Sequence, residues 1–342
     1  MKKVLLIGYG GTIFMRIENN VVKALKNTEE IVKLIPNLSD VADIELAILS
    51  AVDSTNVTPY DWTKIATYIA KRHDEFDGFL IAHGTNTMSY TASALALALG
   101  PGLKKPVIIT GSQLPLGVKR TDAQFNLENA LHAVVKAAEL GIAEVMLSFC
   151  DVVLRGSRTV KISESAFHAF DSPAYLPIAH IQSTGIHFNN YARRYDESID
   201  FKVVPQFDLG VLTIDLVPGQ LPTLIEIVLE SGRCRGLILK SHGAGSVPNV
   251  TDFSFIRLIR DAVSIHRVPV MVSTKFMGGN ASKDVNDEPA VEAIEAGAIH
   301  TADMTDVMVE TKLMWLLAQG YRDTASLRKL MTKDFVGEVT TR

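Results

Sequence analysis

The sequence predicts an α/β protein of two domains: a larger N-terminal domain with a mostly parallel sheet and flanking helices, and a smaller C-terminal α/β domain. Short apolar runs alternate with amphipathic helical patterns along the chain, which is typical of parallel strands joined by helices. A chain of 342 residues is also longer than one compact core usually accommodates. We therefore expect domains at residues 1–187 and 209–342, joined by a linker at residues 188–208.

The elements of the first domain follow from its apolar runs. We expect strands at residues 4–7, 44–49, 78–82, 107–110 and 144–149. We expect helices between them at residues 27–34, 59–73, 90–99 and 122–140. Asp122 begins the last window, and its side chain is a suitable N-cap. Residues 152–161 alternate apolar and basic residues around Gly156, which predicts a β-hairpin.

The second domain follows an irregular segment, residues 167–207, which is rich in Pro, Asn, Tyr and His and suits a connection between domains. We expect strands at residues 210–216, 236–240 and 268–273, and helices near residues 221–231, 253–266 and 305–317. Ligands of open parallel sheets collect at the carboxyl ends of the strands. The loops after the strands are therefore the places to look for a site.

Composition excludes several classes of function. With 34 basic and 38 acidic residues, the net charge of −4 offers no electrostatic footprint for nucleic acid or an anionic membrane. Cys150 and Cys234 form neither a disulfide framework nor a ligand cluster by spacing, and they fit a reducing compartment. The apolar run after Lys3 is too short for the hydrophobic region of a secretory signal peptide. No apolar stretch in the sequence approaches the length of a membrane-spanning helix. We expect a cytoplasmic location.

Two loops carry residues that could react with or bind a substrate. The first has the sequence GYGGTI and places the hydroxyl of Thr12 after the end of the first strand. The alternative interpretation is a glycine-rich turn in which the threonine is incidental. Dinucleotide binding is disfavoured because the G-x-G-x-x-G spacing is missing. The second loop, HGTNT from His83 to Thr87, precedes a helix whose N-terminal amides suit an oxyanion or carboxylate. We assign no catalytic role to His83, since a histidine at a buried strand end is commonly structural.

Several stretches, in their order and spacing, resemble the bacterial and archaeal L-asparaginase family over essentially the whole chain. They are GGTI (10–13), VDSTNVTPYDW (52–62), HGTNTMSYTASAL (83–95), TGSQLP (110–115), LRGSRTVK (154–161) and TADMT (301–305). The resemblance implies that Thr12 attacks the side-chain amide of L-asparagine, ammonia leaves, and water releases the acid from an acyl-enzyme. Thr85 and Lys161 would assist, because an alcohol needs a base and a lysine of lowered pKa can act as one.

The resemblance also implies a substrate pocket and an assembly. The pocket would contain Gly11, Asp53, Ser54, Gly84, Asn86 and Ser112. Asp53 and Ser54 would bind the α-carboxylate and α-ammonium of the substrate, although an Asx turn ending a strand is the alternative for this pair. From the sequence itself, no metal is expected, because no cluster of His, Cys, Asp or Glu has ligand spacing, and no cofactor is expected either. A homodimer or dimer of dimers would complete the site, with Asn249 as a candidate donor from the second subunit.

Two positions depart from the family pattern. Asn86 stands where the family has an aspartate, so recognition of the α-ammonium should weaken by about 1–3 kcal/mol, and loss of the anion should lower the pKa of Lys161. The family's lid tyrosine is missing from residues 14–27, where Glu18 or Asn19 could take its place. Tyr9 is an unsuitable substitute because it ends a strand.

These departures leave three alternatives to a standard asparaginase. One is an amidohydrolase whose substrate lacks a free α-ammonium. Another is a weak, inactive or purely binding homologue, which the retention of Thr12, Thr85 and Lys161 disfavours. The third is a subunit of a tRNA-dependent amidotransferase, which we rank low because such a subunit needs an extra N-terminal domain and this sequence starts at the first strand.

Overall fold

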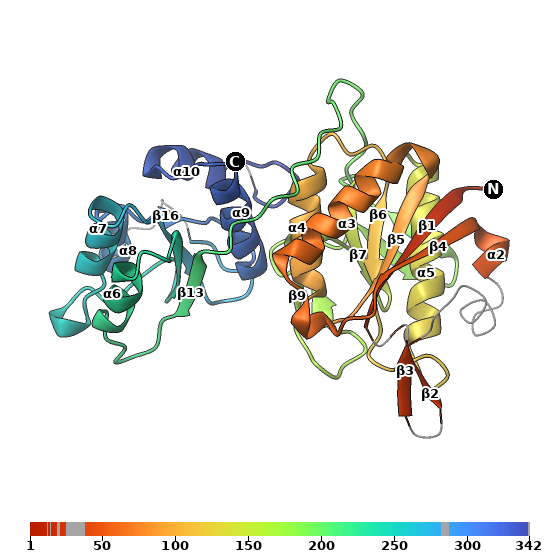
Figure 1. Ribbon diagram of the computed structural model, residues 1–342, viewed down its shortest axis with the longest axis horizontal. Coiled ribbons are helices and arrows are strands. Elements are labelled where there is room, and N and C mark those ends of the chain that lie inside the picture. The colour runs from red at the N-terminus through yellow and green to blue at the C-terminus, as the bar shows by residue number, and fades with distance from the viewer. Residues whose placement is uncertain (12, 14, 19–20, 25–37, 282–286, 341–342) are drawn as a thin grey trace. The chain divides into compact units, whose positions relative to one another are not determined.

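The computed structural model describes the chain except residues 12, 14, 19–20, 25–37, 282–286 and 341–342. The described chain forms two units, Met1–Pro205 and Gln206–Arg342 (Figure 1). The division lies within the range proposed for the linker, residues 188–208. The α/β class expected from the sequence, with mainly parallel sheets in both parts, is confirmed.

The first unit contains a sheet with strand order β12-β11-β8-β7-β6-β5-β1-β4. Its parallel part comprises β1 (Lys3–Tyr9), β4 (Asp43–Ser50), β5 (Gly78–His83), β6 (Val107–Thr110) and β7 (Val145–Phe149). All five strands were predicted, because each is a short apolar run between polar turns. The antiparallel part comprises β8 (Val152–Arg155), β11 (Ala179–Gln182) and β12 (Gly185–Phe188).

Helices cover both faces of this sheet (Figure 1). Those on one face are α3 (Pro59–Arg72) and α4 (Met88–Leu99), and those on the other are α2 (Leu38–Val41) and α5 (Ala123–Glu139). Alternate strand residues point to opposite faces, so Val4 and Leu6 of β1 join the buried core beneath α5. Three predicted helices are thereby confirmed, while the one expected at residues 27–34 lies outside the described residues.

The hairpin predicted for residues 152–161 is wrong. Strand β8 pairs with the preceding β7, with Phe149 opposite Val152, and Cys150 in the turn has a φ of +54°. The tight turn therefore comes before the alternating stretch. Gly156 begins a short 3-10 helix, η4 (Gly156–Arg158), and a Cβ there would lie 2.8 Å from the Val145 carbonyl oxygen. Close packing against β7 explains this glycine.

Two further expectations need correction. The segment 167–207 contains β10 (Phe170–Asp171), which pairs with β9 (Val160–Lys161), as well as β11 and β12. We did not predict these strands, because they are short and their polar residues interrupt any apolar run. Asp122 precedes α5 but makes no side-chain capping bond. Its carboxylate instead accepts the backbone N–H groups of Gln113 and Leu114, and so holds the preceding loop.

A small antiparallel ribbon follows the glycine loop at the start of the chain. It consists of β2 (Met15–Glu18) and β3 (Val21–Ala24). Glu18, one of the two residues proposed for the lid position, ends β2, and Asn19 lies outside the described residues. The ribbon itself was not predicted.

The second unit has a four-stranded parallel sheet in the order β13-β14-β15-β16. Its strands are β13 (Val211–Asp215), β14 (Gly236–Ser241), β15 (Val270–Thr274) and β16 (Ile299–His300). Its helices are α6 (Thr223–Glu230), α7 (Ile256–Ser264), α8 (Glu288–Glu295), α9 (Asp306–Ala318) and α10 (Thr324–Met331). The three predicted strands and three predicted helices are present, and β16, α8 and α10 are additional.

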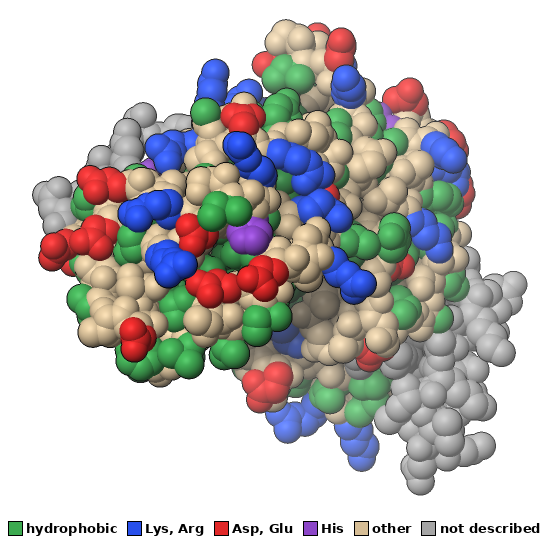
Figure 2. All heavy atoms as spheres, turned by 60° about the vertical axis from the view of Figure 1, so that its left-hand side comes forward, with side chains coloured by type: hydrophobic (Ala, Val, Ile, Leu, Met, Phe, Trp, Pro, Cys, Tyr) green, Lys and Arg blue, Asp and Glu red, His purple; other side chains and the backbone are tan. Residues whose placement is uncertain are grey.

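The charges on the surface are mixed in sign. Figure 2 shows lysine and arginine side chains interspersed with aspartate and glutamate on one face, without a broad patch of either sign. In the described parts of the chain, no helix is both long and apolar enough to cross a membrane.

Candidate active site

The topology of the large sheet selects one crevice. Strand β1 lies between β4 and β5, so the connections that follow β1 and β4 leave for opposite sides. Ligands of open α/β sheets bind at such a switch point, outside the carboxyl ends of the strands. The loops after β1, β4 and β5 begin near Gly10, Val52 and Gly84, and all three contain predicted site residues.

Glycines bring these three loops into backbone contact. A Cβ on Gly11 would lie 2.3 Å from the backbone nitrogen of Gly84, and one on Gly10 only 1.9 Å from the Val52 carbonyl oxygen. Both glycines also have positive φ, 82° and 70°, which side-chain-bearing residues rarely adopt. The glycines of GYGGTI therefore serve close approach between the loops. Thr12, the predicted nucleophile, lies outside the described residues.

Ser54 connects the loop after β4 to the loop after β5. Its side chain is buried, and its Oγ accepts the backbone N–H of Asn86 at 3.2 Å. The Ser54 carbonyl oxygen accepts the hydroxyl of Thr87 at 2.7 Å. Asp53 is exposed beside it, and its Oδ1 accepts the backbone N–H of Thr55 at 2.8 Å, an Asx turn. The pair is thus held in a fixed geometry beside the loop after β5.

Lys161 meets Thr85 and Asn86 although 76 and 75 residues separate them in the sequence. Its Nζ donates to Thr85 Oγ1 at 2.9 Å and to Asn86 Oδ1 at 3.0 Å. Strand β9 carries Lys161, and β5 ends two residues before Thr85. The structure therefore brings together three residues that the sequence could relate only through a family resemblance.

The hydrogen bonds of Asn86 fix the orientation of its amide. Lys161 donates to the amide oxygen, and a protonated lysine has no acceptor, so this oxygen faces Lys161 in the protonated state. The amide nitrogen then donates to Thr55 Oγ1 at 3.0 Å. Thr55 was not among the predicted site residues, although it directly follows Asp53 and Ser54 in the sequence. An aspartate at this position would reverse the hydrogen bond and accept from the Thr55 hydroxyl.

The pKa values of both Lys161 and Asp53 are lowered, but for different reasons. Burial lowers the pKa of Lys161 below its ordinary value, and the exposed Glu164 only partly opposes this. Among the described residues, no carboxylate lies within ion-pair distance of Lys161. The hydrogen bonds from Thr55 lower the pKa of Asp53, so that carboxylate is charged at neutral pH. The site thus combines a lysine prone to lose its proton with a fixed anion.

His83 and Tyr9, for which we expect no catalytic role, are both buried and hydrogen-bonded. His83 is fully buried, with Nδ1 2.7 Å from the Gly84 carbonyl oxygen and Nε2 3.1 Å from Thr91 Oγ1. Burial lowers the pKa of His83 to about 4, so its ring is neutral. The Tyr9 hydroxyl donates to Asp61 at 2.5 Å, and burial together with that carboxylate raises its pKa.

Ser112 and Asn249 have partners that the sequence did not suggest. Ser112 is buried and donates to the carbonyl oxygen of Leu114 at 2.8 Å, within its own loop. The adjacent Gly111 borders the site, because a Cβ there would lie 3.3 Å from Thr85 Cγ2. Asn249, in the second unit, donates to Glu292 at 3.3 Å.

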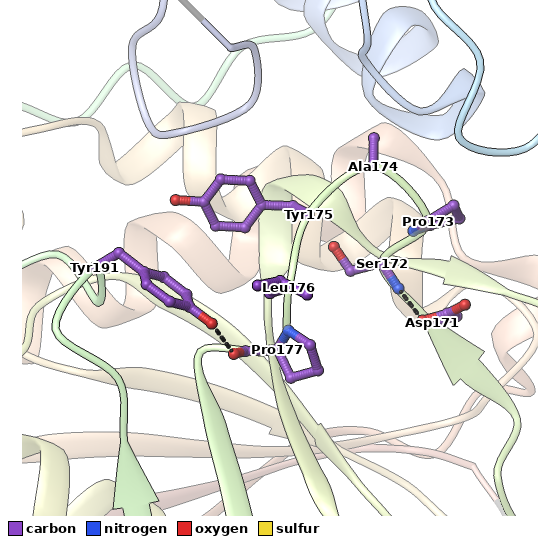
Figure 3. Close-up of a pocket in the computed structure, with 8 residues that line it drawn as sticks. All are labelled: Asp171, Ser172, Pro173, Ala174, Tyr175, Leu176, Pro177 and Tyr191. Atoms are coloured by element: carbon purple, nitrogen blue, oxygen red, sulfur yellow. Dashed lines mark hydrogen bonds between the residues drawn. The ribbon is translucent and has the colours of Figure 1, made fainter.

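A separate cavity of about 690 Å³ opens beyond β10 (Figure 3). It is lined by Asp171, Ser172, Pro173, Ala174, Tyr175, Leu176, Pro177 and Tyr191. The Tyr191 hydroxyl donates to the Pro177 carbonyl oxygen at 2.6 Å across one wall. None of the predicted site residues lines it, so it is distinct from the crevice at the strand ends.

Family models match both parts of the chain. The model described as "Asparaginase, N-terminal" matches residues 3–194, and the "Glutaminase/Asparaginase C-terminal domain" matches residues 210–331. The chain belongs to the asparaginase family. The expected family is confirmed, and with it a hydrolase that acts on linear amides.

Relatives of this asparaginase family member match over its whole length. It is 36% identical to L-asparaginase 1 of Escherichia coli K12, with 99% of this chain and 98% of that protein covered. The thermostable L-asparaginase of Thermococcus kodakarensis has a similar structure, with a TM-score of 0.89, 30% identity, and coverage of 99% and 100%. One component of the glutamyl-tRNA(Gln) amidotransferase of Aeropyrum pernix is 32% identical over 100% of this chain and 80% of that protein.

Proposed function

We propose that this protein hydrolyses the side-chain amide of L-asparagine to aspartate and ammonia, with Thr12 as the nucleophile. Membership of the asparaginase family supports the reaction, and two of the relatives are named L-asparaginase. The observation that carries the mechanism is the contact of Lys161 with Thr85 at 2.9 Å, where burial lowers the pKa of the lysine.

The chemistry proceeds in two displacements. The Thr12 hydroxyl attacks the amide carbon, an ester bond forms, and the C–N bond breaks to release ammonia. Water then hydrolyses the ester and releases aspartate. Neutral Lys161 takes a proton through the Thr85 hydroxyl, because an alcohol or water attacks a carbonyl far faster when a base removes its proton.

Substrate recognition uses the residues around the three loops. Asp53 supplies the negative charge for the α-ammonium that Asn86 cannot supply, since an asparagine side chain is neutral. Backbone amides at Gly11, Gly84 and Asn86 suit the α-carboxylate, with the hydroxyl of Ser54 and the loop of Ser112 completing the pocket. A homodimer or dimer of dimers in the cytoplasm completes the proposal, and light scattering of the purified protein measures the assembly.

Ammonia release from L-asparagine tests this function. The parent protein should release one ammonia for each aspartate formed. Thr12→Ala should lose activity while keeping its fold, and Thr12→Ser, which retains a hydroxyl, should keep a measurable part of it. A folded Thr12→Ala protein with most of the parent turnover would exclude Thr12 as the nucleophile.

Asn86 favours a second candidate, an amidohydrolase whose substrate lacks the α-ammonium. Its side chain is neutral, and its oxygen already accepts from Lys161 while its nitrogen donates to Thr55, so it offers no charge to an ammonium. Succinamate has the carboxylate and amide of asparagine without the ammonium. A kcat/KM higher for succinamate than for L-asparagine would establish this second candidate, and the reverse ranking would support the first.

A further inference from the structure

Outside the crevice, three side chains with metal-binding atoms meet beside the β9–β10 hairpin. They are Cys150 and Asp151, in the turn between β7 and β8, and His168, which lies two residues before β10. One ligand atom of each lies within 4.8 Å of the other two. Residue spacing alone does not reveal this cluster, because its members come from two segments.

We propose that Cys150, Asp151 and His168 bind a zinc ion. A thiolate, an imidazole nitrogen and a carboxylate oxygen are the three side-chain ligands of protein zinc sites, and they discriminate against magnesium, which prefers oxygen alone. Three protein ligands leave a fourth tetrahedral position for water. Both His168 and Asp151 are exposed, so an ion can enter from solvent.

The separations fit a tetrahedral ion after a small adjustment. His168 Nδ1 lies 3.4 Å from Asp151 Oδ1. Two such ligands on one zinc ion are about 3.3 Å apart, and a thiolate and an imidazole about 3.6 Å, from the usual bond lengths and angle. Since no pair of ligand atoms is more than 4.8 Å apart, the adjustment needed is at most about 1 Å, within the reach of side-chain rotation at exposed positions.

The backbone around the cluster holds it in place. The Cys150 N–H donates to Asn126 Oδ1 at 3.0 Å, and the Asp151 carbonyl oxygen accepts the N–H of Ile181 at 2.8 Å. The two segments also meet in the core, where the ring centroids of Phe149 and Phe170 lie 4.9 Å apart. The ligands are therefore presented by two segments that the buried aromatic pair already joins.

The turn that carries Cys150 also has a feature that opposes binding. Burial raises the pKa of the Cys150 thiol, and the neighbouring Asp151 raises it further. Zinc must therefore displace a proton to bind, which a coordinated zinc ion does by lowering the thiol pKa.

A bound ion would tie the hairpin that carries Lys161 to the β7–β8 turn. His168 lies between Lys161 and Phe170, which face each other across β9 and β10. The Ile162 N–H donates to the Ala169 carbonyl oxygen at 2.8 Å next to this ligand. Zinc should therefore slow amide hydrogen exchange in residues 162–169.

Calorimetric titration with zinc chloride of the full chain, freed of metal by a chelator, tests the site. The parent should bind one zinc ion per chain, and Cys150→Ala and His168→Ala should each weaken that binding about tenfold or more. Cobalt(II) should give a thiolate charge-transfer absorption with the parent and not with Cys150→Ala. The control Cys234→Ser, which changes the other cysteine, should bind as the parent does.

Hydrogen exchange gives an independent readout of the same site. Zinc should protect residues 162–169 in the parent and leave them unprotected in Cys150→Ala, while magnesium should have no effect. Equal zinc affinity in the parent and in both alanine variants would overturn the proposal, as would absence of zinc binding by the parent. Neither readout depends on amide hydrolysis, so this site and the proposed function can fail separately.

Discussion

Lys161 in the first unit and Lys312 in the second are both held by hydrogen bonds, but their partners differ in charge. Lys312 is fully buried in α9 and donates to Glu338 Oε1 at 2.7 Å and to two backbone carbonyl oxygens. Lys161 is half-buried and donates to a hydroxyl and a neutral amide. Burial without a countercharge favours the neutral amine, whereas burial with one favours the ion pair. The first arrangement suits proton transfer, and the second stabilises the fold.

The largest expected effect is on catalysis. Lys161→Met keeps the length of the side chain but removes the amine, so kcat should fall by about 10²- to 10⁴-fold, the usual contribution of an acid–base group. The melting temperature should stay close to that of the parent. Lys71→Met, at an exposed lysine of α3, is the matched control and should retain full activity. An active Lys161→Met protein would remove the lysine from the mechanism.

The corresponding change at Lys312 should act on stability instead. Lys312→Met leaves the Glu338 carboxylate buried without its countercharge, and the free energy of unfolding should fall by about 3–5 kcal/mol. Denaturant titration measures this. The double variant Lys312→Met/Glu338→Gln should recover part of the loss, because glutamine can still accept the N–H groups of Phe335 and Val336 that Glu338 accepts. A single variant as stable as the parent would contradict the structural role.

The smallest effect concerns Tyr9. Tyr9→Phe removes the hydroxyl that donates to Asp61, a bond to a charged acceptor at a part-buried position, and should cost about 1.5–3 kcal/mol of stability. Activity should be unchanged, because Tyr9 faces Asp61 and does not supply the missing lid tyrosine. A large fall in kcat with little loss of stability would assign Tyr9 to catalysis.

The sequence predicts elements that depend on local pattern and misses contacts that depend on how the elements are arranged. Apolar runs such as Val107–Thr110 predicted the parallel strands because a buried strand needs apolar residues on both faces. The hairpin was misplaced because no glycine, proline or asparagine marks the Cys150–Asp151 turn. Cys150 adopts its positive φ without being glycine. Approach of Lys161 to Thr85 depends on sheet order, which periodicity does not contain.

Asn86 shows the same limit at the level of a single residue. The sequence predicted a lost charge at this position, and the structure adds the partner that uses the amide, Thr55. That hydrogen bond joins side chains 31 residues apart. Only the packing of the loop after β4 against the loop after β5 reveals it.

The pH dependence of kcat/KM for L-asparagine, in the parent and in Asn86→Asp, tests the central claim most directly. The pKa of Lys161 is already below its ordinary value, and activity should rise with pH as the amine loses its proton. A carboxylate at residue 86 favours the protonated lysine, so the rising limb should move to higher pH by about one unit or more. Coincident limbs in the two proteins would contradict the account of Lys161 as the base.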